Sequence, residues 1–212
     1  MSPSSADLIR FILTIIVILA VPAGAFALSN QLQISAGYNP QVNISDIDFP
    51  YLSTWDGFFD LPFFGARYLR RIHNEWYIFS GYRYTHKTSG LPAGNAATLN
   101  YHVVTIGPYY RSPTTEAEKF FINLVAGAGI SLTSFEPDIA GVTDKLDKTD
   151  FSAFVGLGME RMLFSRFSAV LELNYNFLDT KVVGTFGTSP TPVEVIMQTK
   201  GFDLALGIGC EF

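Results

Sequence analysis

Cysteine is almost absent from this chain, which contains the single residue Cys210. One cysteine cannot close an internal disulfide, and we expect Cys210 to be an apolar filler rather than a reactive thiol. Charged residues make up only 16% of the sequence, and the 19 acidic residues outnumber the 14 basic ones. Because no basic cluster accompanies the formal net charge of −5, the sequence predicts no nucleic-acid partner.

Long apolar runs are missing after Ala27, where none approaches the roughly 20 residues that a membrane-spanning helix needs. Yet 48% of the residues are hydrophobic and 15% are aromatic. The apolar residues must therefore follow a different pattern from that of a spanning helix.

The amino terminus carries a short apolar run. Arg10 precedes the apolar stretch 11–21, and a small-residue site that ends at Ala27 follows it. This order predicts a cleaved secretory signal peptide of residues 1–27. The alternative is an uncleaved membrane anchor, which the shortness of the run disfavours. Residues 28–212 would then form one domain.

The last eleven residues alternate without a break between an apolar face and a small or acidic face. A strand has a side-chain period of two, so this pattern predicts a strand with one apolar side. About 9–11 residues are what a tilted strand needs to cross a bilayer, whereas globular strands average about 5–6. The apolar face comprises Phe202, Leu204, Leu206, Ile208, Cys210 and Phe212.

Seven earlier segments alternate in the same way. They span 31–39, 63–71, 76–86, 99–111, 119–132, 150–161 and 167–177. The connections between the eight segments are alternately long and short, namely 40–62, 72–75, 87–98, 112–118, 133–149, 162–166 and 178–199. Short periplasmic turns and longer external loops are typical of a transmembrane barrel.

One face of these segments carries the strand glycines together with six charged residues. These are Arg67, Arg83, Glu160, Glu172, Asp203 and Glu211. A soluble lipocalin-like barrel would be apolar inside and polar outside. If the charged face of these segments pointed to lipid, each arginine near the midplane would cost about 2–4 kcal/mol. The charged face is therefore expected to line the lumen. A sheet in hydrocarbon must also close, because unpaired backbone groups are costly there. The sequence therefore predicts an all-β fold, an eight-stranded antiparallel transmembrane β-barrel with a polar lumen.

Two local irregularities are expected. Phe79 and Ser80 have exchanged faces, which indicates a β-bulge in the third segment. Pro108 has no N–H to donate and predicts a disturbance near the end of the fourth.

The signal peptide, the eight segments, the charged glycine face and the terminal Phe212 together resemble the small outer-membrane β-barrel superfamily of OmpA-type transmembrane domains, OmpX-like and opacity-type proteins. The stretches 64–68 and 156–160 are similar to its strand patterns. The resemblance implies insertion into the outer membrane of a Gram-negative bacterium, among outer-membrane lipid and lipopolysaccharide, through the barrel assembly machinery. It also implies an assembly signal in the terminal strand, formed by Phe202, Leu204, Leu206, Ile208 and Phe212. The family hosts adhesins, tethers, small pores and lipid-modifying enzymes, so function stays open.

The charged face suggests two roles for the lumen. An eight-stranded barrel is just wide enough for side chains to fill, and a buried charge needs a partner. We expect Arg67 and Glu172 to form an ion pair at mid-depth, with Arg83 and Asp203 alongside nearer the external end. Glu160 and Glu211 should lie nearer the periplasm. The network is then a structural plug or, alternatively, a selectivity or gating element of a narrow porin-like channel.

Catalytic, metal and cofactor sites are not expected. A lipid A-modifying enzyme would need a histidine beside a serine and a carboxylate, and none of His73, His86 and His102 has that setting in the sequence. Asp144, Asp147 and Asp150 recur at a spacing of three, but lysines interleave with them and no EF-hand pattern is present.

The remaining aromatic residues favour membrane interfaces and loop surfaces. Aromatics at the strand ends are expected to form two girdles. They are Tyr38, Tyr82, Tyr84 and Phe177 externally, and Tyr109, Tyr110, Phe120, Phe164, Phe167 and Phe212 at the periplasmic side. The loop 40–62 is rich in aromatics, and 178–199 is expected to prolong the last hairpin above the membrane. These two loops are the candidate surface for an extracellular partner.

Overall fold

The computed structural model describes residues 30–39, 43–45, 61–90, 95–115, 119–139, 141–178, 180–185 and 192–212. The expected signal peptide, residues 1–27, and the aromatic residues of the loop 40–62 that precede Leu61 lie outside this part. Within the described ranges, no helix has the length and hydropathy to cross a membrane.

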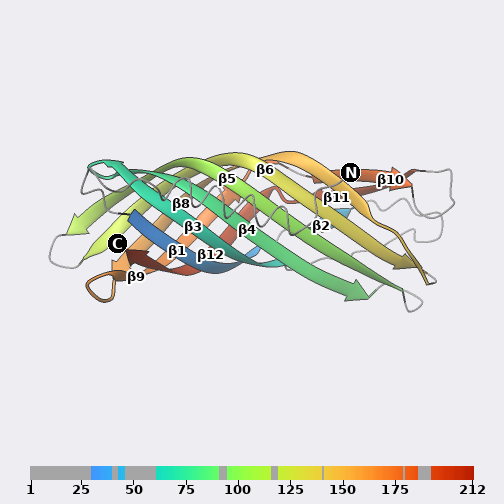
Figure 1. The fold of residues 1–212 in the computed structure, drawn as a ribbon, viewed down its shortest axis with the longest axis horizontal. Coiled ribbons are helices and arrows are strands. Elements are labelled where there is room, and N and C mark those ends of the chain that lie inside the picture. Colours follow the sequence, from blue (N-terminus) through green and yellow to red (C-terminus); the bar gives the residue numbers. More distant parts are fainter. Residues whose placement is uncertain are drawn as a thin grey trace.

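Eight strands close into an antiparallel barrel, which confirms the expected fold class (Figure 1). Each barrel strand pairs with the next along the chain, β5 pairs with β6, and β1 closes the ring against β12. Closure satisfies the backbone hydrogen bonds without leaving a free sheet edge. The strands are β1 (Asn30–Asn39), β3 (Leu61–His73), β4 (Trp76–Gly90), β5 (Ala96–Thr115), β6 (Phe120–Ile139), β8 (Leu146–Met162), β9 (Phe167–Asn176) and β12 (Gly201–Glu211).

The two ends of the barrel differ. Short connections after β3, β5 and β8 lie at the end that also holds both ends of the barrel chain, where Asn30 N donates to Phe212 O at 3.0 Å. We call this the turn end, at the left of Figure 1, and the opposite one the extended end. This arrangement agrees with the alternating connections expected from the sequence.

The strands at the extended end are longer than expected. Residues 87–90 of β4 pair with 96–99 of β5, and β6 and β8 remain paired as far as Phe135 and Leu146. The short strand β7 (Val142–Thr143) then pairs back onto β6. The long loops predicted at 87–98 and 133–149 were therefore wrong in extent. Backbone pairing needs no apolar face, so the strands continue through polar residues.

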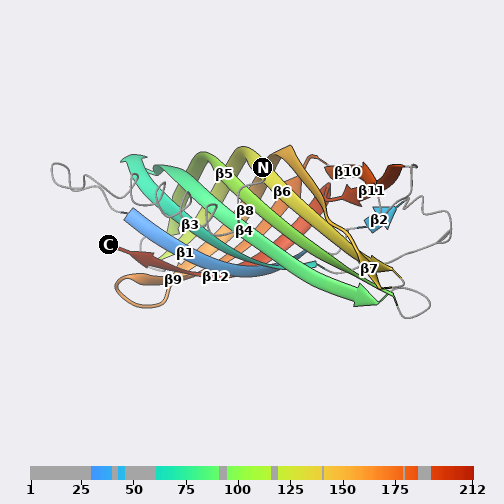
Figure 2. The same ribbon diagram turned by 45° about the vertical axis from the view of Figure 1, so that its right-hand side comes forward.

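A second, three-stranded sheet stands at the extended end (Figure 2). Its strands are β10 (Thr180–Thr185), β11 (Pro192–Gln198) and β2 (Asn43–Ser45). β10 lies beside β8 and β6. After a break in pairing, β10 and β11 continue the register of β9 and β12, with Thr180 opposite Met197 as Asn176 is opposite Gly201. The last hairpin is therefore prolonged beyond the barrel as expected, and β2 adds to it beside β11.

The expected bulge at Phe79 and Ser80 is absent, because both residues pair in register with β3 and with β5. Phe79 simply occupies a lumen position that the alternation had reserved for a polar residue. The disturbance at Pro108 is confirmed. The β5–β6 partners stop at Ile106 and resume at Tyr109 with the same register.

The two faces of the wall are inverted relative to a soluble protein. The outer face exposes large apolar side chains, including Ile34 at 62% and Leu206 at 65%, while Glu160 and Asp203 are buried inside. Tyr68 is an exception on the outer face, because the Phe212 ring lies 6.4 Å away and its hydroxyl donates to Asn30 Oδ1. An outer belt of this kind needs an apolar surrounding.

Candidate functional site: a charged lumen

Three ion-pair clusters follow one another along the lumen. Nearest the extended end, Arg83 Nη1 lies 2.6 Å from Asp203 Oδ2. Arg67 Nη1 lies 2.6 Å from Glu172 Oε1 at mid-depth. The structure therefore places each arginine that the sequence singled out against one of the expected carboxylates.

Arg67 is held by more than its carboxylate. Its guanidinium carbon lies 4.9 Å from the centre of the Phe79 ring and 5.6 Å from that of Tyr109, and Nη1 reaches Gln33 Oε1 at 3.4 Å. Cation–π contacts of this kind are favourable where water is scarce. Three further lumen-facing side chains thus hold the Arg67–Glu172 pair in place.

The cluster at the turn end contains an arginine that the sequence reasoning missed. Arg111 Nε lies 2.9 Å from Glu160 Oε2, and its Nη1 lies 2.5 Å from Glu211 Oε1. The Phe121 ring covers the guanidinium at 3.8 Å. The signal was available, because Thr105 and Gly107 had been assigned to the lumen and the same alternation assigns Arg111 to it.

Tyr109 obeys the same alternation, and its expected place in the outer girdle was wrong. The residue is 0% exposed, and its hydroxyl accepts from Gln33 Nε2 at 3.4 Å. Gln31 continues the network by donating to Glu160 Oε1 at 2.7 Å and to Ser168 Oγ at 3.3 Å. Long polar side chains thereby fill the space between the mid-depth cluster and the turn-end cluster.

An apolar layer closes the lumen at the level of Arg67. It consists of Leu69, Tyr77, Phe79, Tyr109, Val125 and Phe154. Asn123 lies nearby, fully buried, with neither polar atom of its side chain bonded within the described residues. Large side chains fill the lumen of a barrel of this width, so we expect no continuous passage at this level.

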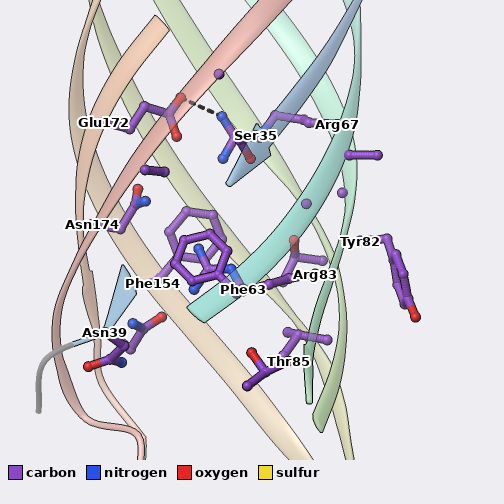
Figure 3. Close-up of a pocket in the computed structure, with 18 of the residues that line it drawn as sticks. Ser35, Asn39, Phe63, Arg67, Tyr82, Arg83, Thr85, Phe154, Glu172 and Asn174 are labelled. Atoms are coloured by element: carbon purple, nitrogen blue, oxygen red, sulfur yellow. Dashed lines mark hydrogen bonds and ion pairs between the residues drawn. The ribbon is translucent and has the colours of Figure 1, made fainter. Parts of the chain in front are cut away.

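A cavity of about 80 Å³ lies between this layer and the extended end. Small residues form much of its wall, among them Ser35, Gly65, Gly81, Ala205 and Gly207. Figure 3 shows Glu172, Asn174 and Arg83 facing the same space, whereas Tyr82 points away from it. The external half of the lumen is therefore hollow where the turn-end half is filled.

Asp203 binds several polar side chains near the extended end of the cavity. It accepts from Asn174 Nδ2 at 2.9 Å and from Asn176 Nδ2 at 2.8 Å, in addition to its ion pair with Arg83. The Arg83 guanidinium lies 4.1 Å from the centre of the Phe63 ring. Three donors thus compensate the buried carboxylate, as a buried charge requires.

The other residues singled out in the sequence lie away from this lumen. The outer face exposes the proposed assembly residues Phe202, Leu204, Leu206, Ile208 and Phe212. Aromatic pairs stand on the same face, with Trp76 and Tyr110 at 4.9 Å and Tyr175 and Phe202 at 5.0 Å between ring centres.

The histidines and the acidic triplet have ordinary partners. His86 Nδ1 lies 2.8 Å from Asn100 Oδ1, and His102 Nδ1 lies 2.7 Å from the Tyr82 hydroxyl. Asp147 and Asp150 face Lys145 and Lys148 at 3.3 and 3.6 Å. Within the described ranges, no three His, Cys, Asp or Glu side chains converge as metal ligands would.

Comparisons with known proteins give likeness at the level of structure. No protein-family model matches the chain, and no curated protein sequence matches it. The crystal structure of the outer membrane protein OprG from Pseudomonas aeruginosa aligns with a TM-score of 0.61 at 14% identity, over 87% of this chain and 95% of OprG. A major outer membrane protein from Thermus thermophilus gives 0.54 at 10% identity, over 88% of this chain and 100% of that one.

A third similar structure is that of the outer membrane protein AlkL in DMPC lipid bilayers, determined by solid-state NMR. It aligns with a TM-score of 0.52 at 15% identity, over 90% of this chain and 94% of AlkL. Such low identities establish shared architecture and not shared activity. The chain has the fold of the small outer-membrane β-barrels.

Proposed function

We propose that this chain is an integral outer-membrane β-barrel protein with a structural or surface-interaction role and a lumen closed by its own side chains. The observation that carries the proposal is the inverted wall, with exposed apolar residues outside and buried, paired charges inside. In water such a belt would aggregate, and in hydrocarbon it is the stable arrangement. The turn end then faces the periplasm and the extended end faces outward.

The location in the bacterial outer membrane draws on two further supports. The amino-terminal pattern of residues 1–27 favours export, and the similar folds are those of outer-membrane proteins. We expect the mature protein in the outer-membrane fraction, with a gel mobility that changes on heating. Deletion of Phe212 should reduce the assembled form if the terminal strand is read by the barrel assembly machinery. Recovery of the wild-type chain in the soluble fraction would contradict the location.

The closed lumen supports a structural role over conduction. In planar bilayers we expect no steady channel from the wild-type protein or from Glu172→Ala, because Phe79 and Tyr109 still block the lumen. Replacing both aromatic residues by alanine should produce a measurable conductance. The matched control is Phe64→Ala, which shortens an aromatic residue on the outer face. A steady wild-type channel would contradict the plug.

A narrow porin-like channel is the second candidate, and the cavity beside Arg67 and Arg83 favours it. That candidate requires the apolar layer to move, so it predicts brief openings rather than steady current.

The proposal assigns surface interaction to the extended end and includes no catalytic step. An extracellular partner would meet the connections 40–62 and 178–199, which supply the separate β10–β11–β2 sheet. Deleting 182–197 should then reduce binding to host cells or matrix, with insertion unchanged. Lipid A should have the same mass with wild-type protein and with His86→Ala, and a difference would favour the enzyme alternative.

A further inference from the structure

The cavity in the external half of the lumen presents guanidinium groups more than carboxylates. Side-chain exposure is 21% for Arg83 and 0% for its partner Asp203, and 14% for Arg67 and 6% for Glu172. The charged residues of the cavity wall are Arg67, Arg83 and Glu172, and Asp203 is not part of the wall. The Arg83–Asp203 pair therefore presents its positive member to the cavity, while the Arg67–Glu172 pair presents both of its charges. An anion is favoured there.

Arg83 has hydrogen-bonding capacity to offer an anion. A guanidinium carries five N–H donors, and Nη1 is the donor that reaches Asp203. Asp203 in turn is compensated by Asn174 and Asn176, so its negative charge is spread over three donors. An oxyanion at Arg83 thus approaches a carboxylate that already accepts hydrogen bonds from two neutral amides. Planar guanidinium groups suit oxyanions particularly well.

Asn174 contributes a hydrogen-bond acceptor, whereas the arginines contribute donors. Its side-chain nitrogen donates to Asp203, but Oδ1 is buried and has no hydrogen-bond partner within the described residues. Asn174 is 1% exposed and lines the same cavity as Arg67 and Arg83. A buried amide oxygen without a donor costs about 1–3 kcal/mol. A ligand that fits this site should therefore carry an O–H as well as negative oxygens.

We propose that this cavity binds a small oxyanion that bears a hydroxyl group, of the hydrogen-phosphate or phosphate-monoester class. The negative oxygens accept from Arg83 and Arg67. The O–H donates to Asn174 Oδ1, which requires a small turn of the amide, because Oδ1 lies against Gly156 and is not exposed to the cavity. The volume of about 80 Å³ accommodates such a group together with water.

The turn end supplies an internal contrast. There the exposed member of the cluster is a carboxylate, since the Glu211 side chain is 28% exposed and that of Arg111 is 6%. The site is thus confined to the extended end, where an anion arriving from outside would meet it first. This inference goes beyond the structural role proposed above, which does not require any ligand.

The test uses the full mature protein folded in zwitterionic detergent and titrated with inorganic phosphate near pH 6, followed by calorimetry and phosphorus NMR line width. At that pH phosphate keeps an O–H and sulfate has none, so phosphate should bind more tightly than sulfate. Arg83→Gln should weaken phosphate binding about tenfold or more, because a charge-assisted hydrogen bond is lost. Asn174→Leu should abolish the preference for phosphate over sulfate.

The matched control is Asn123→Leu, which removes another buried asparagine of the lumen that does not line the cavity. It should bind phosphate as the wild type does. Glucose 6-phosphate is titrated in parallel, and tighter binding than phosphate would identify a monoester as the ligand. If Arg83→Gln does not fold, the phosphate-to-sulfate ratio of the wild type and of Asn174→Leu decides.

Three results would overturn the site: no saturable phosphate binding, equal binding by Arg83→Gln, or the same loss in Asn123→Leu. Heat-dependent gel mobility, measured on the same samples, reports whether the barrel is intact. An intact barrel without phosphate binding would sink this inference and leave the proposed structural role standing.

Discussion

The two halves of the lumen contain the same kinds of charged residue but are filled to different degrees. At the turn end, Arg111 lies between Glu160 and Glu211, and Gln31 reaches in from β1 to bond Glu160. At the extended end, Arg83, which pairs with Asp203, borders a cavity of about 80 Å³. The difference comes from the neighbours of the ion pairs.

Long side chains fill the turn-end half, whereas the cavity wall contains many small residues beside large ones such as Phe63 and Phe154. Gln31, Gln33 and Tyr109 surround the mid-depth and turn-end clusters, whereas Ser35 and Gly65 lie on two neighbouring strands beside the cavity. A buried charge needs a partner in either case. Whether the lumen is open beside it depends on side-chain volume on the adjacent strands, and this can be tested by substitution.

The largest effect is expected for Arg111→Met, in the filled half. The change leaves Glu160, which is fully buried, and Glu211 without their shared guanidinium. Breaking a buried ion pair from one side costs about 3–5 kcal/mol. Urea unfolding of the barrel in detergent micelles, followed by tryptophan fluorescence, would measure the loss.

The matched control is the double variant Arg111→Met with Glu160→Gln. It removes the stranded charge, so much of the lost free energy of unfolding should return, and the double-mutant cycle gives the coupling directly. A single variant as stable as the wild type would mean that water reaches Glu160. The turn-end half could then no longer be called filled.

A smaller effect should distinguish added volume in the two halves. A β-carbon at Gly209 would lie 2.4 Å from Gln31 Nε2 and 2.6 Å from Ser168 Oγ, and Gln31 also bonds Glu160. At Gly65 it would lie 3.0 Å from Ser35 Oγ, a short side chain at the cavity. We expect Gly209→Ala to destabilise the barrel by about 1–3 kcal/mol. Gly65→Ala should change stability by less than about 1 kcal/mol.

Unfolding midpoints of the two glycine variants, measured side by side, give this comparison without reference to any ligand. Equal losses would show that the cavity wall is as tightly packed as the turn end.

The period-two alternation was sufficient to predict the eight barrel strands and which face of each meets the lumen. Strand length was harder, because alternation of small and polar residues in 87–98 and 133–149 looks the same in a loop as in an exposed strand. Only partner pairing, as between Thr88 and Thr98, distinguishes the two cases.

The lumen itself was only partly predictable. The alternation assigns Arg67, Arg83 and Glu172 to it, but four large aromatic residues of the apolar layer break the rule that the lumen face is polar, namely Tyr77, Phe79, Tyr109 and Phe154. They are there because the centre of a narrow barrel has to be filled. Which arginine meets which carboxylate depends on the stagger of the strands around the ring, as for Arg111 of β5 and Glu211 of β12. The stagger of the strands cannot be derived from a single sequence.

In the hollow half, Arg83→Gln should cost only about 1 kcal/mol of unfolding free energy. Asp203 keeps its bonds from Asn174 and Asn176, and water in the cavity can replace the missing guanidinium. The same urea titration as for Arg111→Met measures it. A loss as large as that of Arg111→Met would show that the carboxylate is not compensated by the two amides, and that the two halves respond alike.

The smallest effect is expected for Lys145→Ala, beyond both halves of the lumen. Lys145 Nζ lies 3.3 Å from Asp147 Oδ2, and both side chains are exposed, at 54% and 42%. Exposed pairs contribute about 0–1 kcal/mol, since water and salt screen them and ordering two side chains offsets the attraction. The unfolding midpoint should therefore stay within error of the wild type. This variant sets the baseline for the lumen pairs, because it too removes one member of an ion pair but does so in water. A loss similar to that of Arg83→Gln would mean that burial adds little to the contribution of the Arg83–Asp203 pair to stability.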